Sequence, residues 1–274
     1  MGHVRTSDGI RLHYRESGAG RPLVMVHGWT FSGRFFERSA AALAEHARVL
    51  TVDLRGHGDS DKPDHGYRIA RLAKDLRDLL EALDLREATL LGWSLGCPVL
   101  WSYLELFGTD RVDRAVFVEQ TPRQYYAVDW TYAHSTCFDD AALAALQAQV
   151  SADPSGQDRQ QLSMITETGP GPGERDALLA EMAKCPPRVR NAVMAEHTRA
   201  DWRDVLPTFD LPVLVLVARK DRVFDWRGPA WVGDRVPAAR TVFFERSGHA
   251  LFLDEPEKFN RVVAGFHADD RSEA

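Results

Sequence analysis

The segment over residues 88–107 constrains the fold of this chain more than any other. An apolar run over residues 88–92 predicts a short buried strand, and residues 95–107 have the pattern of an amphipathic helix. Between them stands Gly92-Trp93-Ser94-Leu95-Gly96, which matches G-x-S-x-G. In a strand–turn–helix, this places the serine on a sharp, strained turn with its hydroxyl exposed. A serine that merely caps a helix is the competing interpretation, and the strand on one side argues against it.

The same alternation of strand and helix runs through most of the chain. Strands are predicted at residues 3–16 (a hairpin), 22–27, 49–53, 88–92, 115–118, 212–218 and 241–244. Helices are predicted at residues 35–46, 68–83, 95–107, 226–235 and from Pro256 onward. This rhythm predicts an α/β fold with a mostly parallel central sheet covered by helices on both faces.

The alternation of strand and helix stops over residues 120–205. Ala-rich helical stretches occur there at residues 141–150 and 176–184, and a Gly-Pro-Gly-Pro-Gly run separates them. We expect this segment to form a helical cap over the carboxyl edge of the sheet, where open α/β sheets bind ligands. The predicted organisation is therefore a core domain of residues 1–119 and 206–274, with the cap inserted before the last strands.

A serine at such a turn needs a base, because its hydroxyl is a poor nucleophile at neutral pH. His249 is the candidate, since it follows the last predicted strand by five residues. His27 and His57 also lie in loops at strand ends and are the competitors. We interpret His57 as packed against the core and His27 as structural.

The base in turn needs an acid that orients it. Asp221 follows the predicted strand at residues 212–218, which gives the order Ser94, Asp221, His249 along the chain. That is the order expected when a serine occupies this kind of turn. Glu119, at the end of the strand before the cap, is the rival acid, and the chain order favours Asp221.

An attack by Ser94 on a carbonyl creates an oxyanion that needs two fixed donors. The backbone N–H of Leu95, the residue after the nucleophile, is the first candidate. The second is the backbone N–H of Trp29, in the loop after the strand at residues 22–27. The sequence thus supplies a nucleophile, a base, an acid and two donors for acyl transfer.

With these residues in place, the chain resembles the α/β-hydrolase superfamily. The resemblance is carried by His27-Gly28-Trp29, Asp53-Leu54-Arg55-Gly56-His57-Gly58-Asp59-Ser60, Gly92-Trp93-Ser94-Leu95-Gly96, Asp221 and Gly248-His249. Within the superfamily, the chain is similar to the group of small esterases, lactonases and cofactor-free haloperoxidases (perhydrolases). Cys97-Pro98 departs from the small residues that often follow the turn in this group, and the cap matches no named pattern.

The resemblance implies cleavage of carboxylic esters or lactones through an acyl-enzyme, without a metal or another cofactor. The alternatives are perhydrolase or haloperoxidase chemistry, carbon–carbon bond hydrolysis or lysis on the same triad, and, least favoured, a non-catalytic ligand receptor. Enzymes of the fold that use an aspartate where Ser94 stands are disfavoured.

Aromatic and apolar residues near the motifs are candidates for the wall of a substrate pocket. They are Trp29, Phe31, Trp93, Tyr125, Tyr126, Trp130, Phe138, Phe224 and Leu251. Such a wall favours hydrophobic or aromatic esters as small-molecule substrates. The alternative is that half of these residues pack the cap onto the core.

Other classes of partner are disfavoured by the composition. The net charge is −6 and the basic residues are scattered, so no nucleic-acid surface is indicated. No apolar stretch approaches 18 residues, so no membrane span is expected. Cys97, Cys137 and Cys185 form no pair typical of a metal site or a disulfide, and Cys97 is expected in the core. We expect a cytoplasmic protein, and a homo-oligomer is compatible with the sequence.

Overall fold

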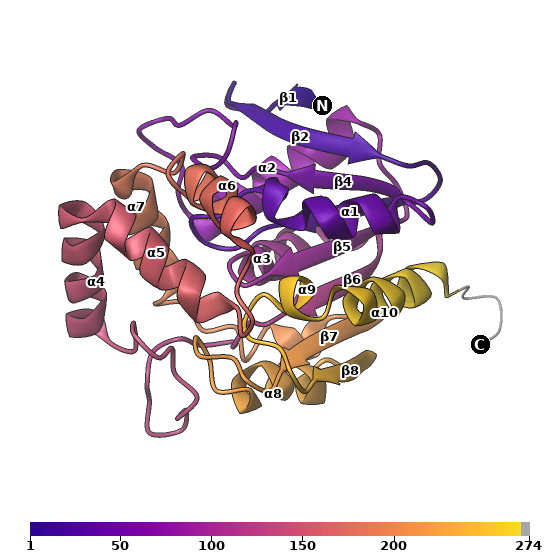
Figure 1. Cartoon of the computed structure of the whole chain (residues 1–274). Helices are drawn as coiled ribbons and strands as arrows, with labels where there is room; N and C mark the ends of the chain where they lie inside the picture. The colour runs from indigo at the N-terminus through magenta and orange to yellow at the C-terminus, as the bar shows by residue number, and fades with distance from the viewer. Residues whose placement is uncertain (270–274) are drawn as a thin grey trace.

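The computed structural model describes residues 1–269 and contains one eight-stranded sheet (Figure 1). The strand order is β1-β2-β4-β3-β5-β6-β7-β8. The strands are β1 (Gly2–Arg5), β2 (Arg11–Ser17), β3 (Pro22–Val26), β4 (Arg48–Val52), β5 (Ala88–Trp93), β6 (Val112–Val118), β7 (Val213–Ala218) and β8 (Ala239–Phe244). Strand β2 pairs antiparallel with β1 and β4, and the other neighbours are parallel. The predicted mostly parallel sheet is confirmed.

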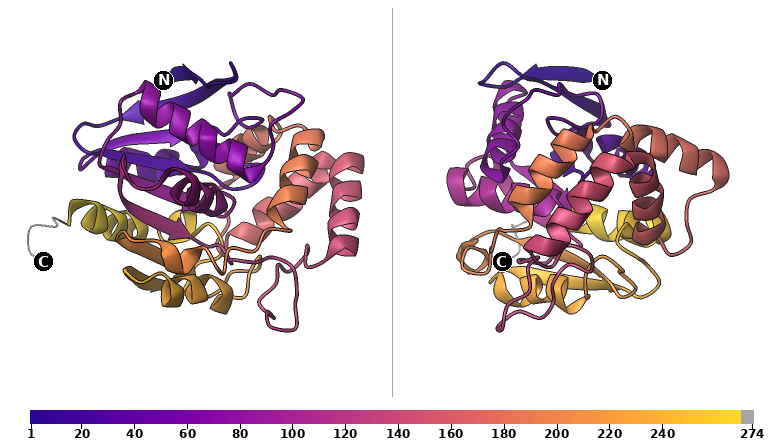
Figure 2. Two further views of the ribbon diagram at one scale, coloured as in Figure 1. Left: turned by 180° about the vertical axis from the view of Figure 1, so that it is seen from behind. Right: turned by 90° about the vertical axis from the view of Figure 1, so that its left-hand side faces the viewer.

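Helices cover both faces of the sheet (Figures 1 and 2). They are the 3-10 helix η1 (Gly33–Phe36), α1 (Glu37–Leu43), α2 (Ile69–Ala82), α3 (Gly96–Phe107), α8 (Arg227–Arg235), α9 (Leu251–Asp254) and α10 (Pro256–Ala268). Strand β3 shows why two cores result: Val24 and Val26 pack with α2 and α3, whereas Leu23 and Met25 pack with α1 and α10. Successive side chains of a strand point to opposite faces, so a strand buried on both sides is apolar throughout.

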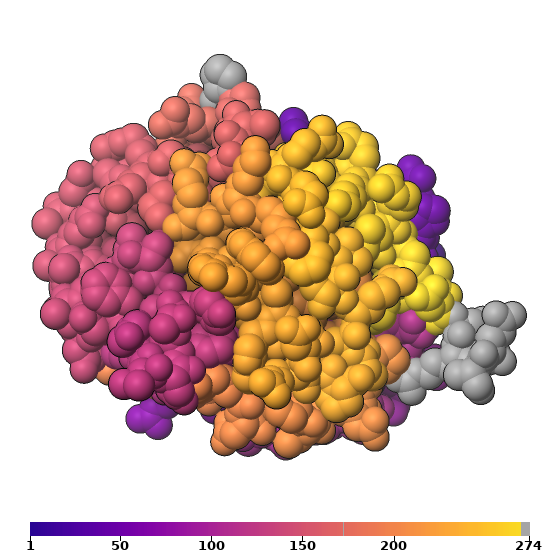
Figure 3. All heavy atoms as spheres, turned by 90° about the horizontal axis from the view of Figure 1, so that it is seen from below, coloured from indigo at the N-terminus to yellow at the C-terminus, as the bar shows by residue number. Residues whose placement is uncertain are grey.

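Four helices lie between β6 and β7 and stand together beside the sheet in Figures 1 and 2. They are α4 (Asp140–Ala152), α5 (Pro154–Ile165), α6 (Pro172–Met182) and α7 (Pro187–His197), followed by the short η2 (Leu206–Thr208). The space-filling view shows this cap abutting the C-terminal part of the core (Figure 3). The predicted limits, residues 120 and 205, enclose all four helices.

The sequence located α4 and α6 but missed α5 and α7. Helix α5 reads Pro-Ser-Gly-Gln-Asp-Arg-Gln-Gln-Leu-Ser-Met-Ile and has too few apolar residues to show a periodic stripe. Both missed helices begin with a proline in the first turn, which is a start signal in its own right. In residues 1–269, no helix combines the length and the apolar character that crossing a membrane requires.

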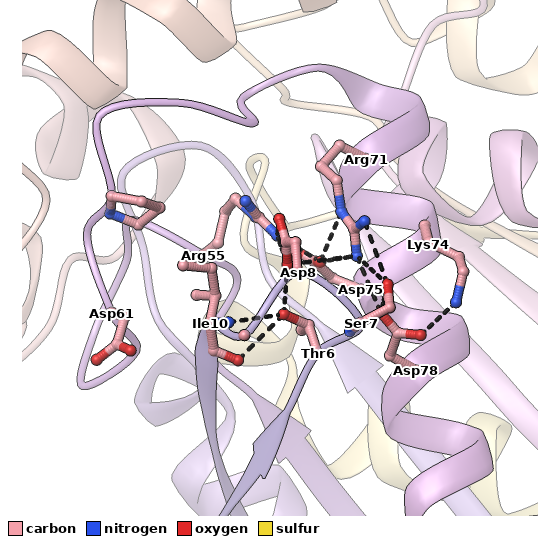
Figure 4. Close-up of polar contacts among 12 residues, drawn as sticks. Thr6, Ser7, Asp8, Ile10, Arg55, Asp61, Arg71, Lys74, Asp75 and Asp78 are labelled. Carbon is pink, nitrogen blue, oxygen red and sulfur yellow. Dashed lines mark hydrogen bonds and ion pairs between the residues drawn. The ribbon is translucent and has the colours of Figure 1, made fainter.

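A buried ion-pair network fixes the loop that follows β4 (Figure 4). Nε and Nη2 of Arg55, whose side chain is fully buried, donate to Asp75 of α2 across 2.6 and 2.7 Å. Nη2 also donates to both carboxylate oxygens of Asp8, in the β1–β2 turn, at 3.0 and 2.9 Å. The loop is thereby held against the core, and His57 within it is fully buried, as predicted.

Candidate active site

Ser94 occupies the turn between β5 and α3 with a φ of +53°. That left-handed conformation is strained for a residue other than glycine, and such strain is typical of functional positions. A Cβ on Gly92 would lie 2.6 Å from the carbonyl carbon of Gly96, and a Cβ on Gly96 would lie 2.3 Å from the Val26 carbonyl oxygen. Only glycine fits at either position. The flanking glycines therefore allow β5 and α3 to meet closely enough to form the turn.

His249 lies in the loop after β8, and its Nδ1 is 2.8 Å from Oδ2 of Asp221. The indole N–H of Trp93 donates to the His249 carbonyl at 2.9 Å. The amide of Ala250 donates to the Ile165 carbonyl of α5 at 2.7 Å. Core and cap thus both fix this loop. Because Asp221 engages Nδ1, Nε2 is the nitrogen available to accept a proton.

Glu119 and Asp221 are neighbouring buried carboxyl groups beside His249. Burial and the neighbouring charge of Asp221 raise the pKa of Glu119 well above its ordinary value of 4.5. Burial opposes the charge of Asp221 too, yet His249 and the hydrogen bonds that Asp221 receives hold its pKa below the ordinary value. Of the two carboxyl groups, Asp221 therefore holds a negative charge more readily than Glu119.

The rival acid and the rival bases have other partners. Oε1 of Glu119 accepts a hydrogen bond from the amide of Ala218, and no hydrogen bond joins Glu119 to His249 within residues 1–269. Nε2 of His27 accepts from the amide of Leu54 at 3.0 Å. Burial lowers the pKa of His57 to about 3, and its Nδ1 lies 3.0 Å from the Arg55 carbonyl. Both competing histidines therefore serve to hold the loops between strands and helices.

The loop after β3 carries Trp29 and is anchored to the cap at three points. The indole N–H of Trp29 donates to the Arg190 carbonyl of α7 at 2.9 Å. The hydroxyl of Thr30 donates to Oε1 of Gln161 at 2.9 Å, and that of Ser32 donates to Glu181 at 3.0 Å. In the part of the chain that the structure describes, the backbone N–H groups of Trp29 and Leu95 donate to no other group. Both remain available for an oxyanion.

A cavity of about 320 Å³ opens at Ser94 and His249. Its wall consists of Trp29, Phe31, Ser94, Gln124, His134, Thr136, Ala142, Ala145, Leu146, Gln149, Gln157, Gln160, Gln161, Met164, Ile165, Met194, His197, Val223, Phe224 and His249. Among the described residues of this wall there is no aspartate, glutamate, lysine or arginine. The cavity is large enough for a small molecule and has an uncharged, mixed apolar and amide surface.

Three of the predicted wall residues line this cavity, namely Trp29, Phe31 and Phe224. Trp93 and Leu251 do not, which corrects that expectation. Trp93 is fully buried and stacks on the core side of Phe31, with ring centroids 4.6 Å apart. Leu251 is fully buried in the same core cluster. Trp93 supports the site from behind, through its hydrogen bond to the His249 carbonyl and its ring contacts with Phe31 and His249.

The predicted wall residues of the cap also lie elsewhere. Trp130 packs edge-on against Trp231 of α8, with ring centroids 5.5 Å apart. The hydroxyl of Tyr125 donates to Asp140 at 3.0 Å, and Tyr126 and Phe138 are largely exposed. An aromatic side chain serves a core, an interface or a ligand equally well, so its position in the sequence did not identify its partner.

Sequence reasoning missed the five glutamines of the wall and both cap histidines, His134 and His197. A signal was present for three of them. Gln157, Gln160 and Gln161 have i, i+3, i+4 spacing, which puts them on one face of α5. A polar face on a helix normally points to solvent, so only the packing of α5 over the sheet shows that this one faces the cavity.

Residues 1–269 contain two clusters of histidine and carboxylate side chains. Within each cluster, the possible metal-ligand atoms lie within 4.8 Å of one another. One is Glu119, Asp221 and His249, and the other is His13, Asp53 and Asp59. In the second cluster, Nδ1 of His13 is 2.9 Å from Asp53, and Lys184 pairs with Asp59 at 2.8 Å. Each histidine is thus paired with an aspartate of its own cluster, and the expectation of a metal-free site stays a prediction.

Known proteins resemble the chain over nearly its whole length. A model described as the alpha/beta hydrolase fold matches residues 21–256. A non-heme chloroperoxidase of Kitasatospora aureofaciens is 31% identical over 278 residues, covering 95% of this chain and 97% of that protein. A pimeloyl-acyl-carrier-protein methyl ester esterase of Vibrio cholerae is 30% identical over 269 residues, covering 94% and 98%. An esterase from Exiguobacterium antarcticum superposes with a TM-score of 0.93 at 25% identity, covering 98% of this chain and all of that one.

Proposed function

Because this chain belongs to the α/β-hydrolase family, we propose that it is a serine hydrolase that cleaves carboxylic esters, lactones included, through an acyl-enzyme on Ser94. One observation carries the proposal. Nδ1 of His249 is hydrogen-bonded to Asp221 at 2.8 Å in the wall of the same cavity that Ser94 lines from its strained turn. The esterases among its relatives support the reaction class.

The reaction follows from the chemistry of these groups. Nε2 of His249 takes the proton of the Ser94 hydroxyl while its oxygen attacks the ester carbonyl. Asp221 holds the imidazole in one tautomer and stabilises the imidazolium that forms. His249 then gives the proton to the leaving alcohol, and an acyl-enzyme remains. Water, activated by His249, attacks the acyl carbon and releases the acid and the free serine.

The tetrahedral intermediate places a negative charge on the former carbonyl oxygen. The backbone N–H groups of Trp29 and Leu95 are the proposed donors to it, and Leu95 precedes the first turn of α3, where the helix dipole favours an anion. One such donor typically lowers the barrier by ~2.7–4 kcal/mol. The cap anchors of the Trp29 loop preset one of the two donors before substrate arrives.

Hydrolysis of a series of p-nitrophenyl esters, from acetate to long acyl chains, tests the proposal. We expect the Ser94→Ala variant to lose about 10⁴-fold or more in kcat. Ser102→Ala is the matched control, because Ser102 is a buried serine of α3 that does not line the cavity. Retention of turnover by a folded Ser94→Ala variant contradicts the mechanism.

A second candidate is cofactor-free perhydrolase chemistry on the same residues. The non-heme chloroperoxidase relative, 31% identical, is the observation that favours it. In this reaction, hydrogen peroxide replaces water in the attack on an acetyl-enzyme, and the peracetic acid released oxidises a halide. Bromination of a phenolic dye that requires both acetate and peroxide, and that Ser94→Ala abolishes, would support this activity. The cytoplasmic location and the oligomeric state stay predictions.

A further inference from the structure

The cavity has a polar end formed by Gln124 and His197. Gln124 lies in the loop after β6, and His197 is the last residue of α7. Both line the cavity, and they are only 2% and 4% exposed. The Nε2 atoms of the two side chains are hydrogen-bonded to each other. Oε1 of Gln124 and Nδ1 of His197 are buried without a partner, and within residues 1–269 no other cavity residue has such an atom.

This pair holds one unused donor and one unused acceptor, both buried, in the wall of the cavity. If Nε2 of Gln124 donates to His197, then Nδ1 of His197 carries the proton, and the free atoms are an N–H donor and the amide oxygen. The amide can also stand in the opposite orientation and accept from Nε2–H of His197. The free groups are then the NH₂ of Gln124 and an unprotonated Nδ1. Both arrangements leave a neutral donor beside a neutral acceptor.

The surroundings of the pair favour an uncharged ligand group. The described wall holds no aspartate, glutamate, lysine or arginine. Burial lowers the pKa of His197 to about 3, so its imidazole is neutral near pH 7. A carboxylate or an ammonium group placed there would lose its hydration without gaining a counter-charge.

The pair lies away from the point where α7 contacts the proposed oxyanion loop. The indole of Trp29, in the oxyanion loop, contacts the Arg190 carbonyl of α7, and His197 comes seven residues later on that helix. At 1.5 Å per residue, this is roughly 10 Å along the helix axis. The pair is therefore separated along α7 from the part of the helix that contacts the proposed oxyanion loop.

We propose that Gln124 and His197 form a recognition subsite for a neutral group that both donates and accepts a hydrogen bond, borne on the substrate remote from its ester carbonyl. A carboxamide and a hydroxyl both meet this description. The inference rests on the proposed ester hydrolysis, and it narrows the substrate class from hydrocarbon esters to esters or lactones with such a group. A buried donor and acceptor disfavour an analogue that leaves them unpaired.

Matched esters test the subsite. p-Nitrophenyl 6-acetamidohexanoate and p-nitrophenyl 8-hydroxyoctanoate carry the polar group on a chain of the same length as p-nitrophenyl nonanoate. We expect kcat/KM of wild type to be at least about tenfold higher for one or both polar esters than for the nonanoate. The two polar esters distinguish an amide from a hydroxyl. The half-ester of octanedioic acid, which bears a carboxylate, should react more slowly than the neutral polar esters.

Variants show whether the pair causes the preference. The preference is measured as kcat/KM for a polar ester divided by kcat/KM for the nonanoate. Gln124→Leu and His197→Phe should each bring this ratio close to one. The ratio is taken within each variant, so a loss of folded protein cancels. Asn191→Leu is the matched control, because Asn191 is on α7 and has an unpartnered buried amide oxygen but does not line the cavity. It should keep the wild-type ratio.

The outcomes separate this inference from the proposed function. Equal kcat/KM values for the polar esters and the nonanoate, or a preference that survives Gln124→Leu, overturn the subsite and leave ester hydrolysis standing. Absence of ester hydrolysis by folded wild type overturns the proposed function. The subsite is then judged by calorimetry on Ser94→Ala with methyl 6-acetamidohexanoate and methyl nonanoate. The subsite is supported if methyl 6-acetamidohexanoate binds more tightly than methyl nonanoate and if Gln124→Leu abolishes this difference. Equal affinity for the two esters overturns it.

Discussion

The hydroxyl of Thr30 donates a hydrogen bond to Oε1 of Gln161 across 2.9 Å, which joins the proposed oxyanion loop to helix α5 of the cap. Nε2 of Gln161 returns a hydrogen bond to the Trp29 carbonyl at 3.3 Å. Thr30 has a φ of +67°, so this loop is held in a strained conformation that its contacts must maintain. The cap therefore does more than cover the cavity, because it fixes the loop that carries one of the two proposed donors.

We expect Gln161→Leu to lower kcat for p-nitrophenyl acetate about tenfold, because the Trp29 N–H loses its fixed position. Thr30→Val, which keeps the β-branched shape, should have a similar effect. Gln161→Leu removes the hydrogen bond that Thr30→Val removes and also the one to the Trp29 carbonyl, so the double variant should be scarcely slower than Gln161→Leu alone. Effects on log kcat that simply add would show that the two residues act independently.

The acid of the proposed triad can be assigned by two isosteric substitutions. Asp221→Asn should lower kcat about 10⁴-fold, because the amide no longer stabilises the required tautomer and charge of His249. Glu119→Gln keeps an oxygen for the Ala218 amide and a donor for Asp221, so it should lower kcat about tenfold or less. Steady-state kinetics on one ester decides the matter. The opposite ranking would make Glu119 the acid.

The raised pKa of Glu119 predicts a pH-dependent difference in stability. Above the ordinary pKa of 4.5, unfolding releases the proton that Glu119 keeps in the folded state, so this residue makes the wild type less stable as pH rises. Glu119→Gln removes that contribution. We expect the free energy of unfolding of the variant minus that of wild type to grow as pH rises above 4.5 towards the raised pKa of the folded state, by at most about 1.4 kcal/mol per pH unit.

Urea denaturation of both proteins at several pH values measures this difference. At pH values below the ordinary range of glutamate, both states of the wild type are protonated, and the difference should be constant. Glu45→Gln, at an exposed site, is the control and should show no growing difference. A difference that does not grow as pH rises above 4.5 would mean that the pKa of Glu119 is not raised in the folded protein.

The Arg55 network predicts a large loss of stability on truncation. Arg55→Leu takes its fully buried partner from the carboxylate of Asp75, which has 1% of its side chain exposed and keeps the partly exposed Arg71 as a cationic partner. We expect a loss of about 3–5 kcal/mol in the free energy of unfolding, measured by urea denaturation. The double variant Arg55→Leu/Asp75→Leu should recover part of the loss, since it leaves no buried charge unpaired. If the double variant is less stable than Arg55→Leu alone, the carboxylate is not the source of the cost.

The fold could be predicted from the sequence because its signals are local. The strands β3, β5 and β7 are buried at every position, so each appears as a continuous apolar run. The Ser94 turn requires a glycine at each end, because a Cβ there would clash with the backbone. This requirement is visible in the five residues of the G-x-S-x-G motif. Helix α5 was missed because its glutamines give no apolar stripe, and the hydrogen bonds and cavity contacts that explain them join distant parts of the chain.

The sequence by itself determined which residues end the parallel strands, and hence that Ser94, Asp221 and His249 would meet. In a parallel sheet all carboxyl ends lie at one edge, so the connectivity alone brings their loops together. Only the tertiary structure decided which side chains line the cavity and which pack the core. Trp93 and Gln161 show why: indole surface is stabilised by any apolar neighbour, and an amide by any polar one. Whether Gln161 faces the cavity depends on how α5 packs across the sheet, which no local pattern encodes.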